Sequence, residues 1–212
     1  MVNLETRAVR TVKDNLKEIA AGEEEACEKL MYALVLSGLA MQMTGSSRPA
    51  SGAEHHLVHL WDMEVVNGHL DALHGEKVSG GTMLVLLEYK KIADAIRRGT
   101  CKVHTCTEED QELLKETFGK KGILGALEKE NTPEPLDDVS TRELSDALPR
   151  ILKIIDALPA VTDMQEMMNT AGCVSRVRDI GLPGEVIEES LLLAPYTRRR
   201  LSLLRLRKML TY

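Results

Sequence analysis

The chain has 212 residues, of which 43% are hydrophobic and 28% are charged, and its formal net charge is −6. This length suits one large domain or two small ones, and the hydrophobic fraction supports a core without disulfide staples. The mild excess of acidic residues argues against nucleic acid as a partner, because phosphate backbones select basic surfaces. Aromatic residues make up only 3% of the chain, so the core must be aliphatic, which favours packed helices.

Apolar residues recur at helical spacing along most of the chain. In the first segment, Leu4, Val9, Val12, Leu16 and Ile19 are separated by charged residues in this way. Runs of alternating β-branched residues, which would indicate strands, are missing. The ranges predicted to be helical are, in chain order, 3–20, 23–43, 53–66, 78–97, 108–118, 141–158, 162–171, 183–194 and 197–210.

Glycine, proline and serine mark the breaks between these segments. Residues 45–52 hold two glycines, a proline and three serines and predict a loop, and residues 119–140 predict a linker or surface loop. Thr107 is the expected cap of the helix at 108–118. Ser140 and Glu143 have the spacing of a capping box, and Pro149 is expected to split or kink the helix that follows. The chain is therefore predicted to be an all-α, multi-helix domain spanning residues 1–212.

Three further segments have more than one interpretation. The apolar run from Leu30 to Met43 is too short to span a bilayer and predicts a buried helix. Its methionines, Met31, Met41 and Met43, are expected in the core, as is Trp61 from the next predicted helix. Cys101 and Cys106 flank His104, but no second pair follows, so a zinc site there is disfavoured. The tail could bind membranes or acidic partners, although we favour a solvated face. Its basic residues are Arg198, Arg199, Arg200, Arg205, Arg207 and Lys208.

The four dispersed cysteines and the polar, charged N-terminus bear on the compartment. The cysteines do not form a dense disulfide framework, and no signal peptide is visible. The sequence therefore predicts a cytoplasmic protein without a membrane span.

Five of the six histidines lie within twenty residues, which indicates metal or proton chemistry. The alternative is a set of ordinary surface histidines on one helix. The five are His55, His56, His59, His69 and His74.

Helix geometry limits which of these histidines can share a metal ion. His55, His59 and Asp62 fall on one helical face, but His55 and Asp62 are about 10 Å apart along the axis at about 1.5 Å per residue. Bonds from zinc to its ligands are only about 2 Å long. One ion can therefore bind His55 and His59, or one of them together with a histidine from another segment. His74, expected in a loop at residues 74–77, is the natural second element, and a third ligand is still needed.

The loop at residues 45–52 precedes the histidine helix and carries Ser47, Arg48 and Ser51. Helix N-termini bind anions, and arginine adds a forked donor, so the loop predicts a site for a phosphate or a polyol. The alternative is a structural Arg48 that donates to loop carbonyls. Residues 79–82 are glycine-rich, but they lack G-x-G-x-x-G spacing and a preceding strand, so they are not a nucleotide fingerprint.

The string SRPASGAEHH at residues 47–56, followed by HLWDM at 59–63 and HGEKV at 74–78, resembles the glycerol-1-phosphate dehydrogenase family. It looks most like the bacterial branch associated with arabinose operons, within the iron-containing alcohol dehydrogenase and dehydroquinate-synthase-like superfamily. The run at 171–198 is similar to the closing helices of that family. The resemblance therefore covers almost the whole chain.

This resemblance implies an α/β domain that binds NAD(P) and a helical domain that binds a divalent metal through one Asp and two His. The metal, Zn²⁺, Ni²⁺ or Fe²⁺, polarises the substrate hydroxyl while hydride passes to the nicotinamide, and dihydroxyacetone phosphate and sn-glycerol 1-phosphate interconvert. Carried onto this sequence, the two histidines are His55 and His74, with His56 or His59 as alternatives for the first.

In that family the Asp ligand and the nucleotide domain lie upstream of the segment that this chain resembles. We therefore expect a metal- and substrate-binding helical domain without cofactor-binding residues of its own. Its partners would be a small phosphorylated polyol and an NAD(P)-binding domain, with homodimerisation left open. The alternative is a non-catalytic helical binding or oligomerisation module derived from the same family.

Overall fold

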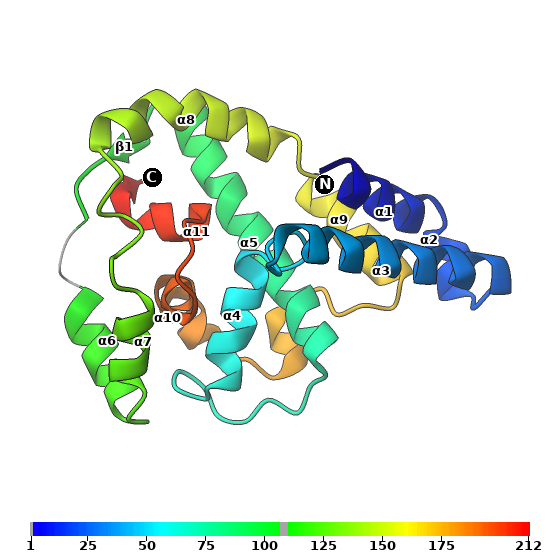
Figure 1. Ribbon diagram of the computed structural model, residues 1–212, viewed down its shortest axis with the longest axis horizontal. Helices are drawn as coiled ribbons and strands as arrows, with labels where there is room; N and C mark the ends of the chain where they lie inside the picture. Colours follow the sequence, from blue (N-terminus) through cyan, green and yellow to red (C-terminus); the bar gives the residue numbers. More distant parts are fainter. Residues whose placement is uncertain (1, 107–109) are drawn as a thin grey trace.

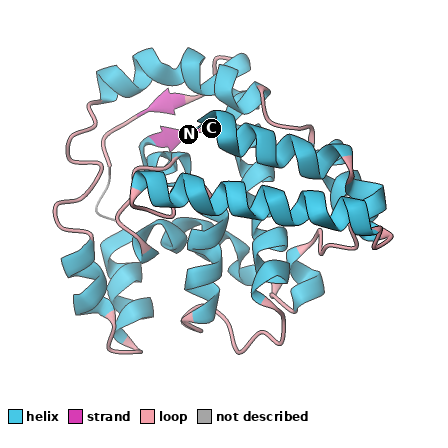
Figure 2. Ribbon diagram, turned by 45° about the vertical axis from the view of Figure 1, so that its right-hand side comes forward, coloured by secondary structure: helices cyan, strands magenta, loops and turns pink. Residues whose placement is uncertain are grey.

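The computed structural model describes residues 2–106 and 110–212, and helices dominate it (Figures 1 and 2). The α-helices are α1 (Val2–Asp14), α2 (Leu16–Ala20), α3 (Glu24–Thr44), α4 (Ala53–Asp62), α5 (His74–Arg97), α6 (Asp110–Gly119), α7 (Leu124–Glu130), α8 (Thr141–Asp156), α9 (Val161–Thr170), α10 (Ile187–Leu193) and α11 (Leu203–Leu206). Short 3₁₀ turns are η1 (Val177–Ile180), η2 (Gly184–Val186), η3 (Ala194–Thr197) and η4 (Arg207–Met209). The predicted all-α class is confirmed.

Within the described ranges, the only strands are β1 (Lys102–Val103) and β2 (Leu210–Thr211), which pair antiparallel. The sequence did not predict this pair, because two residues are too few to show an alternating pattern. The pair holds the end of the chain against the segment that follows α5.

The main core surrounds α4, which packs against α5, α10 and η3 near the middle of the molecule (Figure 1). Leu57, Val58 and Leu60 have no solvent exposure, and Trp61 is also buried, as predicted. The indole Nε1–H of Trp61 donates to the hydroxyl of Ser190 at 3.0 Å, so the one polar atom of this side chain is satisfied. The site described below therefore rests on a rigid helix.

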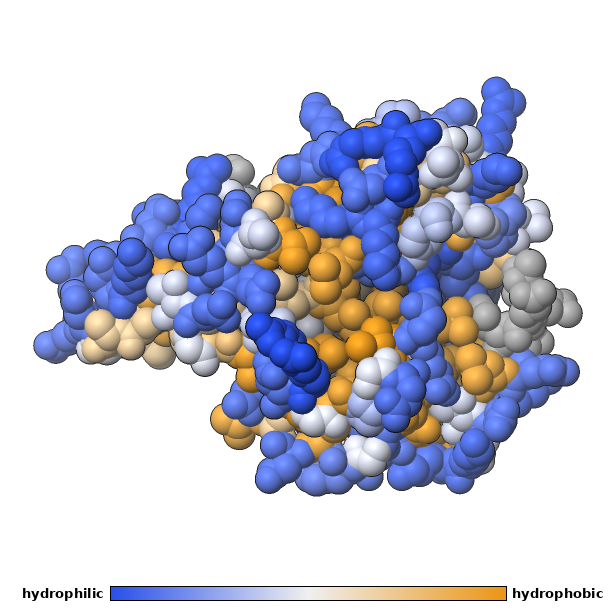
Figure 3. All heavy atoms as spheres, turned by 180° about the vertical axis from the view of Figure 1, so that it is seen from behind, coloured by the Kyte–Doolittle hydropathy of each residue, from blue (hydrophilic) through white to orange (hydrophobic). Residues whose placement is uncertain are grey.

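Helices α1 and α3 pair into an arm that projects from the body (Figure 1). The prediction that the 30–43 segment is a buried helix, with its methionines in the core, is wrong: Met31 is 60% exposed and Met43 is 67% exposed, while Met41 is half-buried. Because α3 is apolar on nearly all sides and α1 covers one side, a second apolar face stays open. The large apolar residues exposed on α3 are Met31, Tyr32, Leu34, Val35, Leu39 and Met43. Figure 3 shows apolar side chains gathered in a hollow beside the arm on the side of the molecule away from the Figure 1 view.

Several helix boundaries differ from those predicted. The first helix breaks at Asn15, whose side-chain amide donates to the carbonyl of Thr11 at 2.8 Å and whose oxygen accepts from Lys29. Residues 119–140 are not all loop, because α7 lies within them. The predicted cap Thr107 and the first two residues of the predicted 108–118 helix lie outside the described residues.

The capping box at the start of α8 is confirmed: the Ser140 hydroxyl accepts the backbone N–H of Glu143 at 3.1 Å. The expected break at Pro149 is not observed, and α8 runs through it. Pro149 is exposed, so the carbonyl that loses its helical partner can bind water instead.

The tail does not form the predicted helix over 197–210. Only a four-residue helix, α11, forms after Ser202, whose hydroxyl accepts the N–H of Arg205. Arg205 is fully buried and donates to the side-chain oxygen of Asn131, and Arg207 binds Glu88. These long-range partners determine the path of the tail, so no amphipathic basic helix exists there.

Candidate metal and phosphate site

Helix α4 begins at a glycine and a carboxylate that organise the first turn. The Glu54 side chain accepts the backbone N–H of Gly52 at 2.6 Å and lies 2.8 Å from Nδ1 of His55. This contact satisfies one of the backbone donors at the helix start. It also joins the 45–52 loop to the first histidine of the cluster.

Helix α5 crosses α4 at a glycine. A Cβ atom at Gly81 would lie 3.2 Å from the backbone oxygen of Glu54, closer than most such contacts in proteins. The glycine-rich stretch at 79–82 therefore serves helix packing. The close approach brings the N-terminal end of α5 beside α4.

At this crossing, His55 from α4 and His74 from α5 come together, with ring centroids 5.7 Å apart and ring planes inclined at 54°. His74 is the first residue of α5, so the prediction that it lies in a loop is wrong. The helix starts before Gly75 because the Glu76 carboxylate accepts the N–H of Leu73 at 2.7 Å. The side chain of His55 is 22% exposed and that of His74 is 58% exposed, so ligands can reach the pair from solvent.

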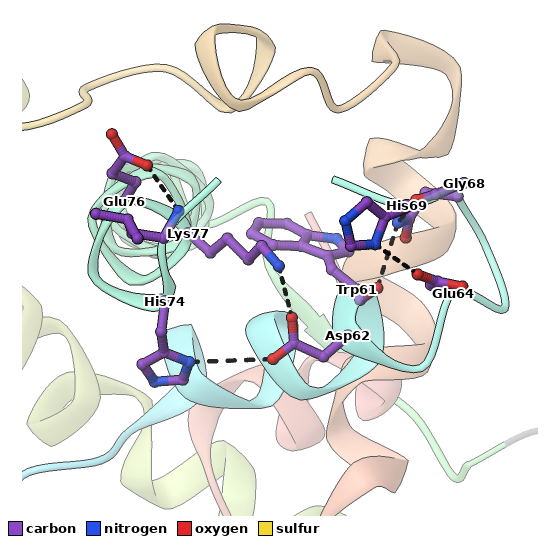
Figure 4. A network of polar contacts seen from close by, with 10 residues as sticks. Trp61, Asp62, Glu64, Gly68, His69, His74, Glu76 and Lys77 are labelled. Carbon is purple, nitrogen blue, oxygen red and sulfur yellow. Dashed lines mark hydrogen bonds and ion pairs between the residues drawn. The ribbon is translucent and has the colours of Figure 1, made fainter. Parts of the chain in front are cut away.

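Asp62, at the end of α4, lies between His74 and Lys77 (Figure 4). Its carboxylate is 4.0 Å from Nδ1 of His74 and 2.8 Å from the ammonium of Lys77. The sequence placed Asp62 on the face of His55 and His59, but gave no sign that it meets α5. Its position suits a residue that orients His74.

The other histidines occupy different environments. Burial lowers the pKa of His59, and the positive charge of Arg198 lowers it further; His59 also interacts electrostatically with His55 and His74, so it lies near the pair. His56 is buried, and neither ring nitrogen has a partner among the described residues. Burial first, and then Arg200, lower the pKa of His56 to about 4. His69 is exposed and meets Glu64 at 2.9 Å, away from His74 (Figure 4).

The histidine pair fits part of a metal site. Two imidazoles that share a tetrahedral ion at bonds of about 2 Å have centroids about 5 Å apart. The observed 5.7 Å separation of His55 and His74 needs only a small side-chain adjustment. Among the side chains that the structure describes, no three His, Cys, Asp or Glu residues are grouped to hold a metal ion. That finding includes Cys101, His104 and Cys106.

The 45–52 loop is held by an arginine that the sequence had not singled out as a site residue. Arg200, in the tail, donates from Nη1 to the carbonyl of Ser51 at 2.8 Å and from Nη2 to the hydroxyl of Ser47 at 2.9 Å. Burial lowers the pKa of Arg200, and the positive charges of Arg48 and Arg198 lower it further. Ser47, Arg48 and Ser51 therefore lie in one cluster with the tail. In the sequence, the sign that pointed to this role of the tail was its run of basic residues at 198–208, which contains no acidic residue.

Comparison with known proteins gives a consistent set of relatives. The chain is 32% identical to the glycerol-1-phosphate dehydrogenase [NAD(P)+] of Halalkalibacterium halodurans, over 93% of this chain and 41% of that protein. It is 29% identical to the enzyme of the same name from Geobacillus stearothermophilus, over 89% of this chain and 40% of that protein. With the Pyrococcus horikoshii enzyme it shares 37% identity over 45% of the chain.

No family model and no solved structure matches the chain. Among the described residues, no helix combines the length and apolar character needed to cross a bilayer. The chain spans about two fifths of the length of the curated relatives that it matches over most of its own length. Over about nine tenths of its own length, the chain is therefore similar in sequence to part of the glycerol-1-phosphate dehydrogenases.

Proposed function

We propose that this chain is the metal- and substrate-binding helical half of an NAD(P)-dependent glycerol-1-phosphate dehydrogenase. The observation that carries the proposal is the meeting of His55 and His74 at the α4–α5 crossing, next to an arginine-lined loop. The relatives act with NAD(P), as their names state. The nucleotide would be bound by a separate domain, because this chain lacks a dinucleotide loop.

The proposed roles follow from the positions of the side chains. His55 and His74 would hold a divalent ion, Zn²⁺, Ni²⁺ or Fe²⁺, together with a carboxylate from outside the described residues. When bound, such an ion polarises the oxygen at the carbon that exchanges hydride. Asp62, whose carboxylate is 4.0 Å from Nδ1 of His74, would orient that ring by accepting a hydrogen bond after a small side-chain shift. The loop residues Ser47, Arg48 and Ser51 would bind a substrate phosphate.

Isothermal titration of the full chain with Zn²⁺ and Ni²⁺ tests the metal assignment. Weak binding is expected, since a site without its full ligand set loses affinity. His55→Ala and His74→Ala should abolish it, whereas the matched control His69→Ala should leave it unchanged. Adding the NAD(P)-binding region of a relative should tighten metal binding, and oxidation of sn-glycerol 1-phosphate should appear only then. The assignment is wrong if His69→Ala abolishes binding while the other two variants retain it.

The open apolar face of α3 favours a second candidate, a helical binding or oligomerisation module. Six large apolar residues are exposed on this one helix, and an exposed apolar patch of this kind is typical of a surface that contacts another protein. Sedimentation at increasing concentration tests this candidate. A dimer that dissociates in Val35→Glu, combined with no metal binding under any condition, would favour the module over the enzyme.

A further inference from the structure

Arg200 connects two segments that are 149 residues apart in the sequence, the tail and the 45–52 loop. It is half-buried, and its two hydrogen bonds to Ser47 and Ser51 use two of its five N–H donors. No other hydrogen bond from the side chain of Arg200 is present in the part of the chain that the structure describes. Three donors on a fixed, planar group thus stay available beside the loop.

The charge around Arg200 is strongly positive. Arg48 and Arg198 both act on it as like charges, and the charge of Glu54 offsets them in part. The Glu54 carboxylate is already engaged, since it accepts from Gly52 and contacts His55. An anion placed here would relieve the repulsion between the guanidinium groups and accept their remaining N–H donors.

The location gives a reason for this cluster. Glu54 contacts His55 directly and also accepts from Gly52 of the loop that Arg200 holds, so Glu54 links this loop to the histidine pair. A small molecule that carries a phosphate and a hydroxyl a few bonds apart could reach both places at once. A longer ligand is not required.

We propose that Arg200, together with Arg48, binds the phosphate of a small polyol phosphate and holds it between the tail and the 45–52 loop. The substrate class rests on the proposed function, whereas the phosphate site itself rests on the arginine cluster. The pyrophosphate of a dinucleotide has the same chemistry and is the other source of phosphate to be distinguished. Arg199 does not take part, because its Nε donates to the carbonyl of Pro133 at 2.8 Å in another segment.

The test is calorimetry on the full chain, with a chelator present so that no metal contributes. The probes are inorganic phosphate, sn-glycerol 1-phosphate, glycerol and NADP⁺. Wild-type chain should bind both small phosphates, bind glycerol at least tenfold more weakly, and prefer sn-glycerol 1-phosphate to NADP⁺. Arg200→Gln and Arg48→Gln should each lose about tenfold or more in affinity for phosphate, while Arg199→Gln should match wild type.

Arg200→Lys separates ligand binding from a purely structural role. Lysine keeps the charge but loses the fork, so it should restore part of the phosphate affinity of Arg200→Gln. Circular dichroism checks that each variant folds, and if Arg200→Gln does not, Arg200→Lys and Arg48→Gln carry the test. The proposal is overturned if the arginine variants bind phosphate like wild type, if Arg199→Gln loses as much, or if only NADP⁺ binds.

The outcome is independent of the metal assignment. His55→Ala and His74→Ala should keep phosphate binding in the presence of chelator. Phosphate binding without any metal binding would sink the proposed dehydrogenase role and leave the anion site standing. Metal binding without phosphate binding would overturn the proposed phosphate site and leave the proposed dehydrogenase role standing.

Discussion

Replacing Glu88 with Gln should destabilise the fold substantially, because this buried carboxylate holds the end of the chain. Glu88 lies on α5 and is only 2% exposed. It accepts from Nε of Arg207 at 2.6 Å, from the hydroxyl of Tyr212, and from Lys91 at 3.1 Å. Tyr212 follows β2, so the network joins the tail to the longest helix.

The size of the effect follows from what the substitution leaves behind. Glutamine can still accept a hydrogen bond, but Arg207, whose side chain is 15% exposed, keeps only Glu188 as an ionic partner among the described residues. Breaking one side of a buried ion pair costs about 3–5 kcal/mol. Since the amide retains part of the bonding, we expect about 2–4 kcal/mol. For a chain of this size that is a fall of about 4–16 °C in melting temperature, at about 2–4 °C per kcal/mol.

The pH dependence gives a second readout. Burial alone would raise the pKa of Glu88, but the hydrogen bond from Tyr212 and the charges of Arg207 and Lys91 outweigh it, and the pKa falls below its ordinary value of 4.5. A carboxylate with a lowered pKa stabilises the fold above its unfolded pKa, and this contribution is lost as the pH falls through the folded value. The stability difference between wild type and Glu88→Gln should therefore shrink with acidification below about pH 4.5.

Urea unfolding followed by circular dichroism, at pH 7 and at intervals down to pH 3, measures both effects. Asp94→Asn is the matched control on the same helix, because its side chain is 60% exposed and pairs with exposed Arg97. It should change stability by less than about 0.5 kcal/mol. If Glu88→Gln costs no more than this control, or if its deficit grows with acidification, the account of the buried network is refuted.

Two further predictions concern the site. Asp62→Asn should weaken Ni²⁺ binding in the complemented protein by about 10- to 100-fold, as is usual for the partners of metal-binding histidines, and unchanged affinity in calorimetry would remove Asp62 from that role. Gly81→Ala should lower the melting temperature and weaken metal binding together, because the added Cβ would lie 3.2 Å from the Glu54 carbonyl oxygen and push α4 away from α5. The control is Gly38→Ala on α3, where a Cβ meets nothing within 4 Å, and it should be neutral or stabilising.

The sequence predicted those parts of the fold that depend on local pattern. The all-α class and the capping box at Ser140 follow from spacing within a few residues, and both are confirmed. The predicted start of α5, at residue 78, is four residues too late: Gly75 resembles a break, whereas the Glu76 side chain caps the helix so that it begins at His74. The sequence alone does not show whether a capping side chain or a nearby glycine determines where a helix begins.

Features that depend on distant partners were beyond the reach of periodicity. The tail has an amphipathic spacing, yet Arg205 and Arg207 bind Asn131 and Glu88, and these bonds override the helix. The exposure of α3 could not be predicted either, because a helix that is apolar on all sides looks the same whether or not its second face is covered. In both cases the deciding partner lies far away in the sequence or outside the chain.

The candidate site, like the fold, could be predicted only in part from local spacing. Spacing along α4 predicted that His55 and Asp62 do not comfortably share one ion, and the resemblance to known enzymes selected His74 as the second histidine. The structure places these two rings 5.7 Å apart, but no spacing rule could have produced that distance, since it depends on the approach of α5 at Gly81. Arg200 was visible only as one base among six in the tail.

The charges at the crossing bear on what else the site needs. Histidine side chains bind metals as neutral imidazoles, so His55 and His74 would bring no negative charge to a divalent cation. The nearest carboxylates are already paired: Glu54 with the N–H of Gly52, and Asp62 with Lys77. Arg48 and Arg198 add positive charge nearby, which disfavours a cation further. We infer that a metal can be held firmly here only when an additional carboxylate enters from outside the described residues, and that a bound phosphate, by neutralising the arginines, would favour the same cation.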